Sequence, residues 1–157
     1  MSKKYLILIE NINNELDEIN TIIQRAKKAW TLAFEKNEPF YLDSVALSLH
    51  DFYSGLERLF ERIAEGVDEY KPEGINWHRE ILNQMNLDVP NVRPAIISQS
   101  LKEKLDEYRA FRHIVRNVYA HNLRLDRMKN LIENIDITFK EIKESLQIFC
   151  KFLNSVK

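Results

Sequence analysis

The clearest hydrophobic pattern of the chain lies in its C-terminal part. Apolar residues between positions 125 and 156 recur at alternating spacings of three and four. This spacing places the apolar side chains on one face of an α-helix and is typical of helices that pack against other helices. The pattern predicts one long helix over residues 125–156. Its apolar face consists of Leu125, Met128, Ile132, Ile135, Phe139, Ile142, Leu146, Phe149, Leu153 and Val156.

The N-terminal part repeats this pattern. It stops at residues 37–39, because Pro39 disfavours a helical conformation of the residue before it. A first long helix that ends near Asn37 is therefore predicted. This face is long enough to be shared with a second chain, although packing into the chain's own core is the simpler interpretation. Its apolar residues are Ile9, Ile12, Leu16, Ile19, Ile23, Ala26, Trp30 and Ala33.

A second helix is predicted to begin near Asp43 or Ser44, since either side chain can cap a helix N-terminus. It ends within residues 66–72, which include glycine and proline. Its inward-facing residues are Val45, Leu49, Phe52, Leu56, Leu59 and Ile63.

Two further helices complete the pattern. A short helix is predicted over residues 76–85, and an extended linker follows over residues 88–94, which contain two prolines. A fourth long helix begins near Ser98 or Ser100. Its inward-facing residues are Leu101, Leu105, Tyr108, Phe111, Val115 and Val118.

Long amphipathic helices joined by short connections predict an all-α fold. We expect an antiparallel up-and-down bundle of four long helices plus one short helix. With 157 residues, the chain has the usual size of a single domain, so residues 1–157 are expected to form one. Only 3 glycines and 4 prolines are present, which argues against an all-β fold.

The composition indicates a cytoplasmic protein without a membrane segment. Hydrophobic residues make up 45% and charged residues 30% of the chain, and no apolar stretch approaches the ~20 residues of a membrane span. The apolar run near the N-terminus ends at Glu10, too early for the core of a signal peptide.

Basic residues gather in one region, although the net charge of the chain is only −1. Residues 101–130 hold eight basic and four acidic residues, and this local excess can attract phosphate groups. A solvated, charged helix face explains the same pattern equally well. The basic residues are Lys102, Lys104, Arg109, Arg112, Arg116, Arg124, Arg127 and Lys129.

Arg116 and His121 lie within this region and are separated by four residues, the first of which is Asn117. An arginine binds phosphate bidentately and keeps its charge, and a histidine can give or take a proton near neutral pH. The two side chains can therefore support cleavage of an RNA phosphodiester bond by attack of the ribose 2′-OH. We predict Arg116, Asn117 and His121 as catalytic residues.

The spacing of this motif sets two structural conditions. Five positions on a straight helix place two side chains about 140° apart, so the helix must loosen or end between Arg116 and His121. The reaction also needs an acid and a base, which one histidine per chain does not easily supply in a single step. Two chains that place their motifs face to face would supply both, so a homodimer is expected.

Other residues near the motif are predicted to bind RNA or line its cleft. The predicted RNA-binding residues are Arg109, Arg112, Arg124 and Arg127, and the predicted cleft-lining residues are His113 and Tyr119. Arg109, Arg112 and Arg116 share one helix face beside the apolar stripe. An arginine at the edge of a core needs a carboxylate or a phosphate partner, and for Arg112 a structural salt bridge is the simpler interpretation.

No metal site is predicted. The four histidines, His50, His78, His113 and His121, show no His-x-x-x-His or carboxylate-flanked ligand spacing. His50 is interpreted as a partly buried hydrogen-bonding residue. His78, next to Trp77, is interpreted as part of a packing element, with a lining role in the cleft as the alternative.

The motif and two further segments resemble the HepT-like branch of the HEPN superfamily. The segments are Asp51–Arg58, with the sequence DFYSGLER, and Phe111–Asn117, with the sequence FRHIVRN. The resemblance covers about residues 49–148. It implies a HEPN-like helical bundle that dimerises with both motifs in one cleft and acts as a metal-independent endoribonuclease without a cofactor. It also implies a toxin of a type VII- or type II-like toxin–antitoxin pair, whose antitoxin is a minimal nucleotidyltransferase (MNT).

One position departs from the pattern of these toxins. They commonly carry a tyrosine two positions after the histidine, which the antitoxin adenylylates, whereas this chain has Asn122 and Leu123. Inhibition by occlusion, or modification of another hydroxyl such as that of Tyr119, are the alternatives. A non-catalytic HEPN module that binds a nucleotide or a partner nucleotidyltransferase is the alternative function.

Overall fold

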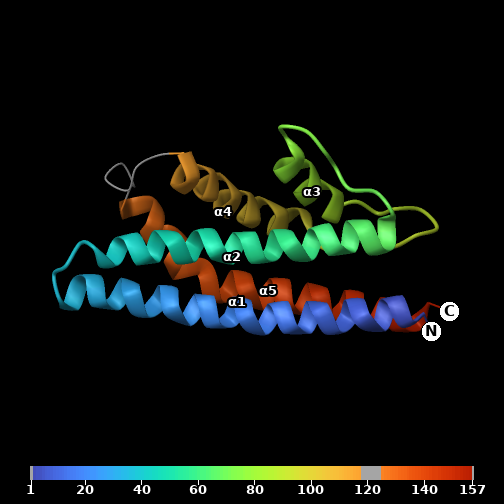
Figure 1. The fold of residues 1–157 in the computed structure, drawn as a ribbon, viewed down its shortest axis with the longest axis horizontal. Coiled ribbons are helices and arrows are strands. Elements are labelled where there is room, and N and C mark those ends of the chain that lie inside the picture. The colour runs from blue at the N-terminus through green and yellow to red at the C-terminus, as the bar shows by residue number, and fades with distance from the viewer. Residues whose placement is uncertain (1, 118–124, 157) are drawn as a thin grey trace.

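The structure, a computed structural model, describes residues 2–117 and 125–156; for Arg116 and Asn117 it describes the backbone only. The helices are α1 (Lys3–Glu35), α2 (Tyr41–Ile63), α3 (Trp77–Met85), α4 (Gln99–Asn117) and α5 (Leu125–Ser155). The four long helices alternate in direction along the long axis of the molecule, and α3 is the short helix (Figure 1). The predicted all-α, up-and-down bundle is confirmed.

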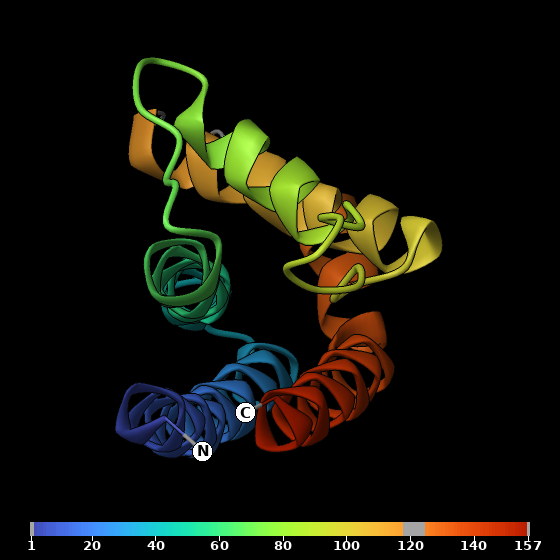
Figure 2. The same ribbon diagram turned by 90° about the vertical axis from the view of Figure 1, so that its right-hand side faces the viewer.

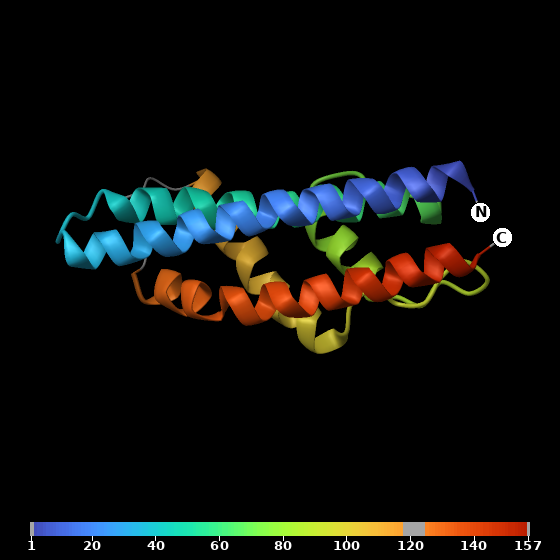
Figure 3. The same ribbon diagram turned by 90° about the horizontal axis from the view of Figure 1, so that it is seen from below.

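The helices are arranged in layers. Seen from one end, α1 and α5 lie side by side at the bottom, and α2 lies above α1 (Figure 2). Helices α3 and α4 lie on the opposite side of α2, where α4 crosses from α5 to α2. From below, α1 and α5 run along the length of the molecule, and the N-terminal end of α1 lies near the C-terminal end of α5 (Figure 3).

The buried apolar residues form one cluster to which every helix contributes. Gly55 on α2 allows a close approach to α1, because a Cβ atom there would lie 2.8 Å from Cγ1 of Ile19. Beside this contact, Nη2 of Arg58 on α2 donates a hydrogen bond of 2.8 Å to Oε1 of Glu15 on α1. The register between α1 and α2 is therefore fixed by a close apolar contact and an ion pair.

The ends of the helices differ from the predictions in places. Helix α2 begins at Tyr41, before the predicted Asp43 or Ser44, and its N-cap residue Phe40 provides no side-chain hydrogen bond. The end of α2 continues into a π-helical turn, Ala64–Asp68, which stops where Glu69 adopts a left-handed φ of 55°. Periodicity does not reveal a π-turn, since the turn inserts one residue into the helical repeat.

The predicted extended linker over residues 88–94 is wrong, because this segment contains a tight turn. The amide of Val89 donates to the carbonyl of Arg93 at 2.8 Å, and the amide of Arg93 donates back at 3.0 Å. Asn91 lies at the turn with φ of 65°, a conformation that asparagine tolerates better than most residues.

The apolar face of α5 also drifts from the predicted heptad pattern. Leu125 is 46% exposed and Phe139 is only partly buried, while Leu131 and Thr138 are buried in the bundle. A straight helix has 3.6 residues per turn, so a strict 3.5-residue pattern turns slowly away from its neighbours. No helix in the part of the chain that the structure describes is long and apolar enough to cross a membrane.

Candidate functional site

The predicted catalytic motif begins in the last described turn of α4. The backbones of Arg116 and Asn117 form the last described turn of this helix, and α5 begins at Leu125. His121, like Tyr119 and Arg124, lies outside the described residues. The predicted break between Arg116 and His121 and the catalytic assignment therefore stay predictions.

One turn before Arg116, Arg112 connects α4 to α2. Its Nε atom donates a hydrogen bond of 2.9 Å to Oγ of Ser54, and Nη2 lies 3.8 Å from Oε1 of Glu57. The Arg112 side chain is 14% exposed and the Glu57 side chain 4%. The salt bridge considered for Arg112 is thus present, and it fixes this guanidinium against α2.

The carboxylate of Glu57 also holds a histidine of α3. Its Oε2 atom lies 2.7 Å from Nδ1 of His78, whose side chain is 24% exposed. The imidazole of His78 lies 3.7 Å from the ring of Trp77, measured between centroids. The buried carboxylate therefore joins α2, α3 and α4 at one point. We call Ser54, Glu57, His78 and Arg112 the polar seam.

Tyr53 is buried next to the seam, and its hydroxyl has no hydrogen-bond partner among the described residues. Burial raises the pKa of Tyr53 far above its ordinary value, and the nearby negative charge of Glu57 raises it further. The phenol therefore stays neutral and cannot serve as a proton acceptor near neutral pH.

His50 lies one turn before Ser54 on the same face of α2. Its Nδ1 atom is 3.3 Å from Oδ1 of Asp51, and its side chain is 24% exposed. One face of α2 carries His50, Ser54 and Glu57. This face is directed toward α4, because Ser54 and Glu57 both contact Arg112. The prediction that His50 is a partly buried hydrogen-bonding residue is confirmed.

The other residues predicted to bind RNA or line the cleft lie at different depths. Nε of Arg109 donates a hydrogen bond of 2.6 Å to Oδ1 of Asp106, and the Arg109 side chain is 15% exposed. Arg127 is half-buried in the first turn of α5, and His113 is exposed on α4. The guanidiniums of Arg109 and Arg112 both have carboxylate partners within the chain, Asp106 and Glu57. An RNA phosphate that binds either guanidinium would therefore bind beside its carboxylate.

A second buried cluster was not found by sequence reasoning. Arg93, whose side chain is fully buried, donates from Nε and Nη2 to the two carboxylate oxygens of Asp68 at 2.6 and 2.7 Å. Its remaining donors reach the carbonyl oxygens of Leu87, Pro94 and Gln84 at 3.0 to 3.1 Å. An arginine between prolines in a region without apolar periodicity was the only signal in the sequence. We call Asp68, Gln84 and Arg93 the Arg93 cluster.

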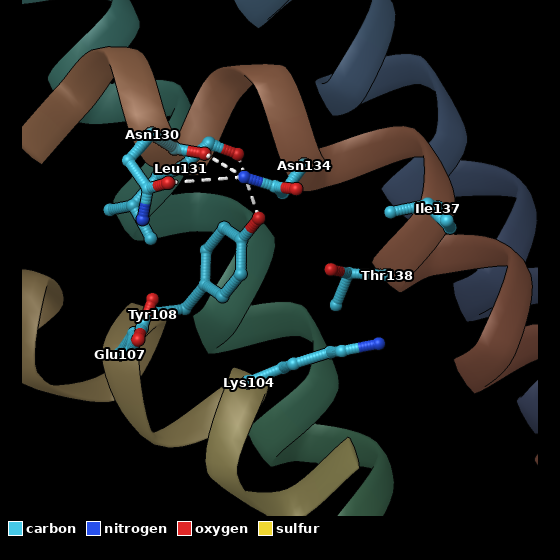
Figure 4. A pocket seen from close by; sticks show the side chains of 8 residues that line it. All are labelled: Lys104, Glu107, Tyr108, Asn130, Leu131, Asn134, Ile137 and Thr138. Atoms are coloured by element: carbon cyan, nitrogen blue, oxygen red, sulfur yellow. Dashed lines mark hydrogen bonds between the residues drawn. The ribbon is translucent and has the colours of Figure 1, made fainter. Parts of the chain in front are cut away.

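Two cavities lie away from the polar seam. A cavity of about 160 Å³ lies between α4 and α5, where the hydroxyl of Tyr108 donates to the carbonyl of Leu131 at 2.7 Å (Figure 4). In the same cavity, Nδ2 of Asn134 donates to the carbonyl oxygen and Oδ1 of Asn130. A more open cavity of about 480 Å³ borders Gln84. Within residues 2–117 and 125–156, no three metal-ligating side chains lie together.

The all-α bundle has the architecture of a HEPN-like helical protein. The family described as "HepT-like protein" matches residues 44–153, well over half of the chain. The chain therefore belongs to the HepT-like protein family of the HEPN superfamily. Searches of curated proteins and of solved structures gave no match.

The structure also explains how the two segments that carry the resemblance are related. Asp51–Arg58 lies on α2 and Phe111–Asn117 on α4, and they meet through the contacts of Arg112 with Ser54 and Glu57. Residues 58 positions apart in the sequence thus form one side of the same site.

Proposed function

We propose that the protein is a metal-independent endoribonuclease of a toxin–antitoxin pair, which cleaves RNA by attack of the ribose 2′-OH on the adjacent phosphate. The observation that carries this proposal is membership of the HepT-like family together with the Arg116–Asn117–His121 motif, which begins in the last described turn of α4. Arg116 would bind the scissile phosphate, His121 would transfer a proton, and Asn117 would support them by hydrogen bonding.

The position of the motif supports this role. Behind the last turn, the contacts of Arg112 with Ser54 and Glu57 hold α4 against α2, so Arg116 starts from a fixed backbone. A rigid support of this kind is what a catalytic group needs for a defined geometry.

The direct experiment incubates the purified protein with RNA in the presence of a chelator and identifies the ends of the products. We expect 2′,3′-cyclic phosphate and 5′-hydroxyl ends. The double variant Arg116→Ala/His121→Ala should cleave at least about 1,000-fold more slowly, because it lacks both the phosphate ligand and the proton-transfer group. Arg25→Ala, which removes an exposed arginine of α1, is the matched control and should cleave like the parent.

Two results would contradict the proposal. Equal cleavage by the double variant and the parent would remove the motif from the reaction. Absence of any product between pH 5 and 9, with RNA or nucleotide bound, would favour the non-catalytic binding module instead.

We further propose that the active species is a homodimer in which Arg116 and His121 of different chains share one phosphate. Mixing Arg116→Ala chains with His121→Ala chains tests this directly. A shared site regains activity, since the common cleft of a mixed dimer then holds one native Arg116 and one native His121. A site built within one chain stays inactive in the same mixture.

The proposed antitoxin is a minimal nucleotidyltransferase that inhibits the ribonuclease. Because Leu123 stands where related toxins have the modified tyrosine, inhibition by occlusion is the form we propose. Addition of the partner without nucleotide should then suppress cleavage. Suppression that needs ATP, with an increase in the mass of the chain, would show modification at another residue.

A further inference from the structure

We propose that the open cavity beside Gln84 is a docking site for an arginine-containing segment of a partner protein, whose guanidinium binds between Gln84 and Glu80. The cavity has a volume of about 480 Å³ and is lined by residues of α3, of the segment after it, and of the π-helical turn and its following loop. The inference is independent of the proposed ribonuclease function, since it concerns none of the motif residues.

Gln84 provides the most specific feature of this cavity. Its side chain is buried, and its Nε2 atom donates to Oδ2 of Asp68 at 2.7 Å and to the carbonyl of Tyr70 at 3.0 Å. Both partners accept, so the amide orientation is fixed and Oε1 is left as an acceptor. Among the described residues, Oε1 has no hydrogen-bond partner. A buried acceptor without a partner is costly, and a donor that enters the cavity can supply the missing bond.

The other polar groups of the lining also favour a ligand that donates hydrogen bonds and carries positive charge. Glu80 adds an exposed carboxylate from α3. The carboxylate of Asp68 is already bound by Arg93 and Gln84. In the described part of the chain, no basic side chain lines the cavity. The lining therefore offers acceptors and negative charge without a cation of its own.

An arginine side chain combines the properties that this lining requires. Its planar guanidinium carries five N–H donors, so it can bind an amide oxygen and a carboxylate at the same time, whereas lysine offers a compact point charge. Tyr70, which is largely exposed, presents an aromatic ring on which a guanidinium can stack. Pro72 and Leu87 line the same cavity and can pack against the apolar stem of the arginine.

The surface around the cavity is larger than one side chain needs. A neighbouring cavity of about 280 Å³ shares Pro72 with it and is also lined by Gly74 and Trp77. Ile75, next to Gly74, is 96% exposed, and Leu87 is 56% exposed. Exposed apolar side chains beside a polar cavity are typical of sites that bind proteins. We therefore expect apolar residues on both sides of the arginine in the bound segment.

The local charge selects a basic protein segment over a nucleic acid. Residues 61–90 hold seven acidic and three basic residues, whereas residues 101–130 hold four acidic and eight basic ones. One of the three basic residues, Lys71, is already paired with Glu61 and Glu65. An acidic surface repels phosphate groups and attracts a cationic partner.

The test adds acetyl-Leu-Arg-Leu-amide to the ¹⁵N-labelled protein and follows the amide resonances by NMR. We expect shifts confined to residues 68–92, including the side-chain amide of Gln84, and a Kd of about 1 mM or lower. Acetyl-Leu-Lys-Leu-amide should bind at least about threefold more weakly, because an ammonium group lacks the planar set of donors. Acetyl-Leu-Gln-Leu-amide, which has no charge on its central side chain, should bind at least about tenfold more weakly.

A pair of charge reversals tests the position of the site. Glu80→Arg should raise the Kd of the arginine peptide at least about tenfold, because it places a cation in the cavity. Glu144→Arg makes the same change on an exposed residue of α5 and is the matched control, with an expected Kd within about twofold of the parent. If Glu80→Arg fails to fold, as judged by circular dichroism, Glu80→Gln serves instead and should weaken binding at least about threefold.

Several results would overturn the proposal. No shift at 10 mM arginine peptide, or equal weakening by Glu80→Arg and Glu144→Arg, would remove the site. Equal binding of the lysine peptide would contradict recognition of a guanidinium.

The remaining results would identify a different occupant. If L-argininamide binds as tightly as the peptide, the cavity takes a small molecule. If Glu80→Arg, but not Glu144→Arg, changes the oligomeric state in sedimentation experiments, the occupant is a second copy of the chain. If an RNA oligonucleotide shifts the same amides, the occupant is a nucleic acid.

Discussion

The Arg93 cluster and the polar seam are two buried ionic groups whose arginines differ in how many of their N–H donors the described residues use. Arg93 uses all five of its N–H donors within the protein, and its side chain is fully buried. In the seam, Arg112 makes one hydrogen bond and one longer ion contact with described residues, and its side chain is 14% exposed. The described residues thus use every donor of Arg93 but fewer donors of Arg112.

This difference indicates a structural role for Arg93. Its side chain cannot bind anything further without losing a bond, so it fixes the turn after α3 against the end of α2. Among the described residues, Oε1 of Gln84 in the Arg93 cluster has no hydrogen-bond partner, and neither has the buried hydroxyl of Tyr53 beside the seam. The use of the arginine donors, and not the presence of an unpaired polar atom, therefore separates the two groups.

The largest expected effect comes from a substitution that breaks the Arg93 cluster. Arg93→Ala should lower the free energy of unfolding by about 3–5 kcal/mol, because it leaves the buried carboxylate of Asp68 without its counter-ion. Urea unfolding measures this loss. Lys104→Ala, which removes a half-exposed ion pair with Glu141, is the control and should cost less than about 1 kcal/mol. A similar cost for both variants would show that the Arg93 cluster is not a structural centre.

The next effect tests the carboxylate of the seam. Glu57→Gln should lower the free energy of unfolding by about 2 kcal/mol, less than Arg93→Ala, because Arg112 can turn partly toward solvent. It should also slow RNA cleavage, since Arg112 and His78 lose their common partner. Unfolding curves and cleavage rates of the same preparation measure both effects. A larger loss of stability than in Arg93→Ala would reverse the comparison.

A smaller effect compares two buried tyrosines. Tyr108→Phe removes the hydroxyl that donates to the carbonyl of Leu131, so we expect a loss of about 1–2 kcal/mol. Tyr53→Phe removes a hydroxyl without a partner among the described residues and should change stability by less than about 0.5 kcal/mol or increase it. Urea unfolding at pH 7 distinguishes the two. An equal loss in both would mean that the Tyr53 hydroxyl is satisfied.

The smallest effect concerns alkaline pH. Burial raises the pKa of Tyr53 and of Tyr108, so the folded protein holds these two protons more tightly than the unfolded chain does. The stabilisation is complete below the ordinary tyrosine pKa of about 10 and is lost as the pH rises above it. At pH 10.5, ionisation of each tyrosine in the unfolded chain should lower the free energy of unfolding by about 0.8 kcal/mol. Unfolding series from pH 8 to 10.5 should therefore fall less steeply in each Tyr→Phe variant than in the parent.

Much of the fold follows from local pattern. The spacing of apolar residues predicted all four long helices and the short one, because each amphipathic face depends only on residues in adjacent turns of the same helix. The start of α2 was predicted from capping residues that the structure does not use, and the π-turn at Ala64–Asp68 has no signal in the spacing. The turn within residues 88–94 was also missed, since it is closed by backbone bonds and by Arg93.

The candidate site follows from the sequence in part. The Arg116–His121 spacing and the basic face of α4 were visible because they lie on one short segment. The link between Arg112 and Glu57 was not visible, nor was the histidine that Glu57 holds, because these residues come from three helices. Side chains that meet across helices depend on the register in which those helices pack.

The sequence by itself determined which segments become helices, which face each one buries and where the arginine and histidine of the motif lie. Only the tertiary structure decided that Ser54 and Glu57 of α2 face Arg112 of α4. The physical reason is that helix formation is encoded within a few turns of chain. The pairing of helices is set by close contacts between distant residues, such as that of Gly55 with Ile19.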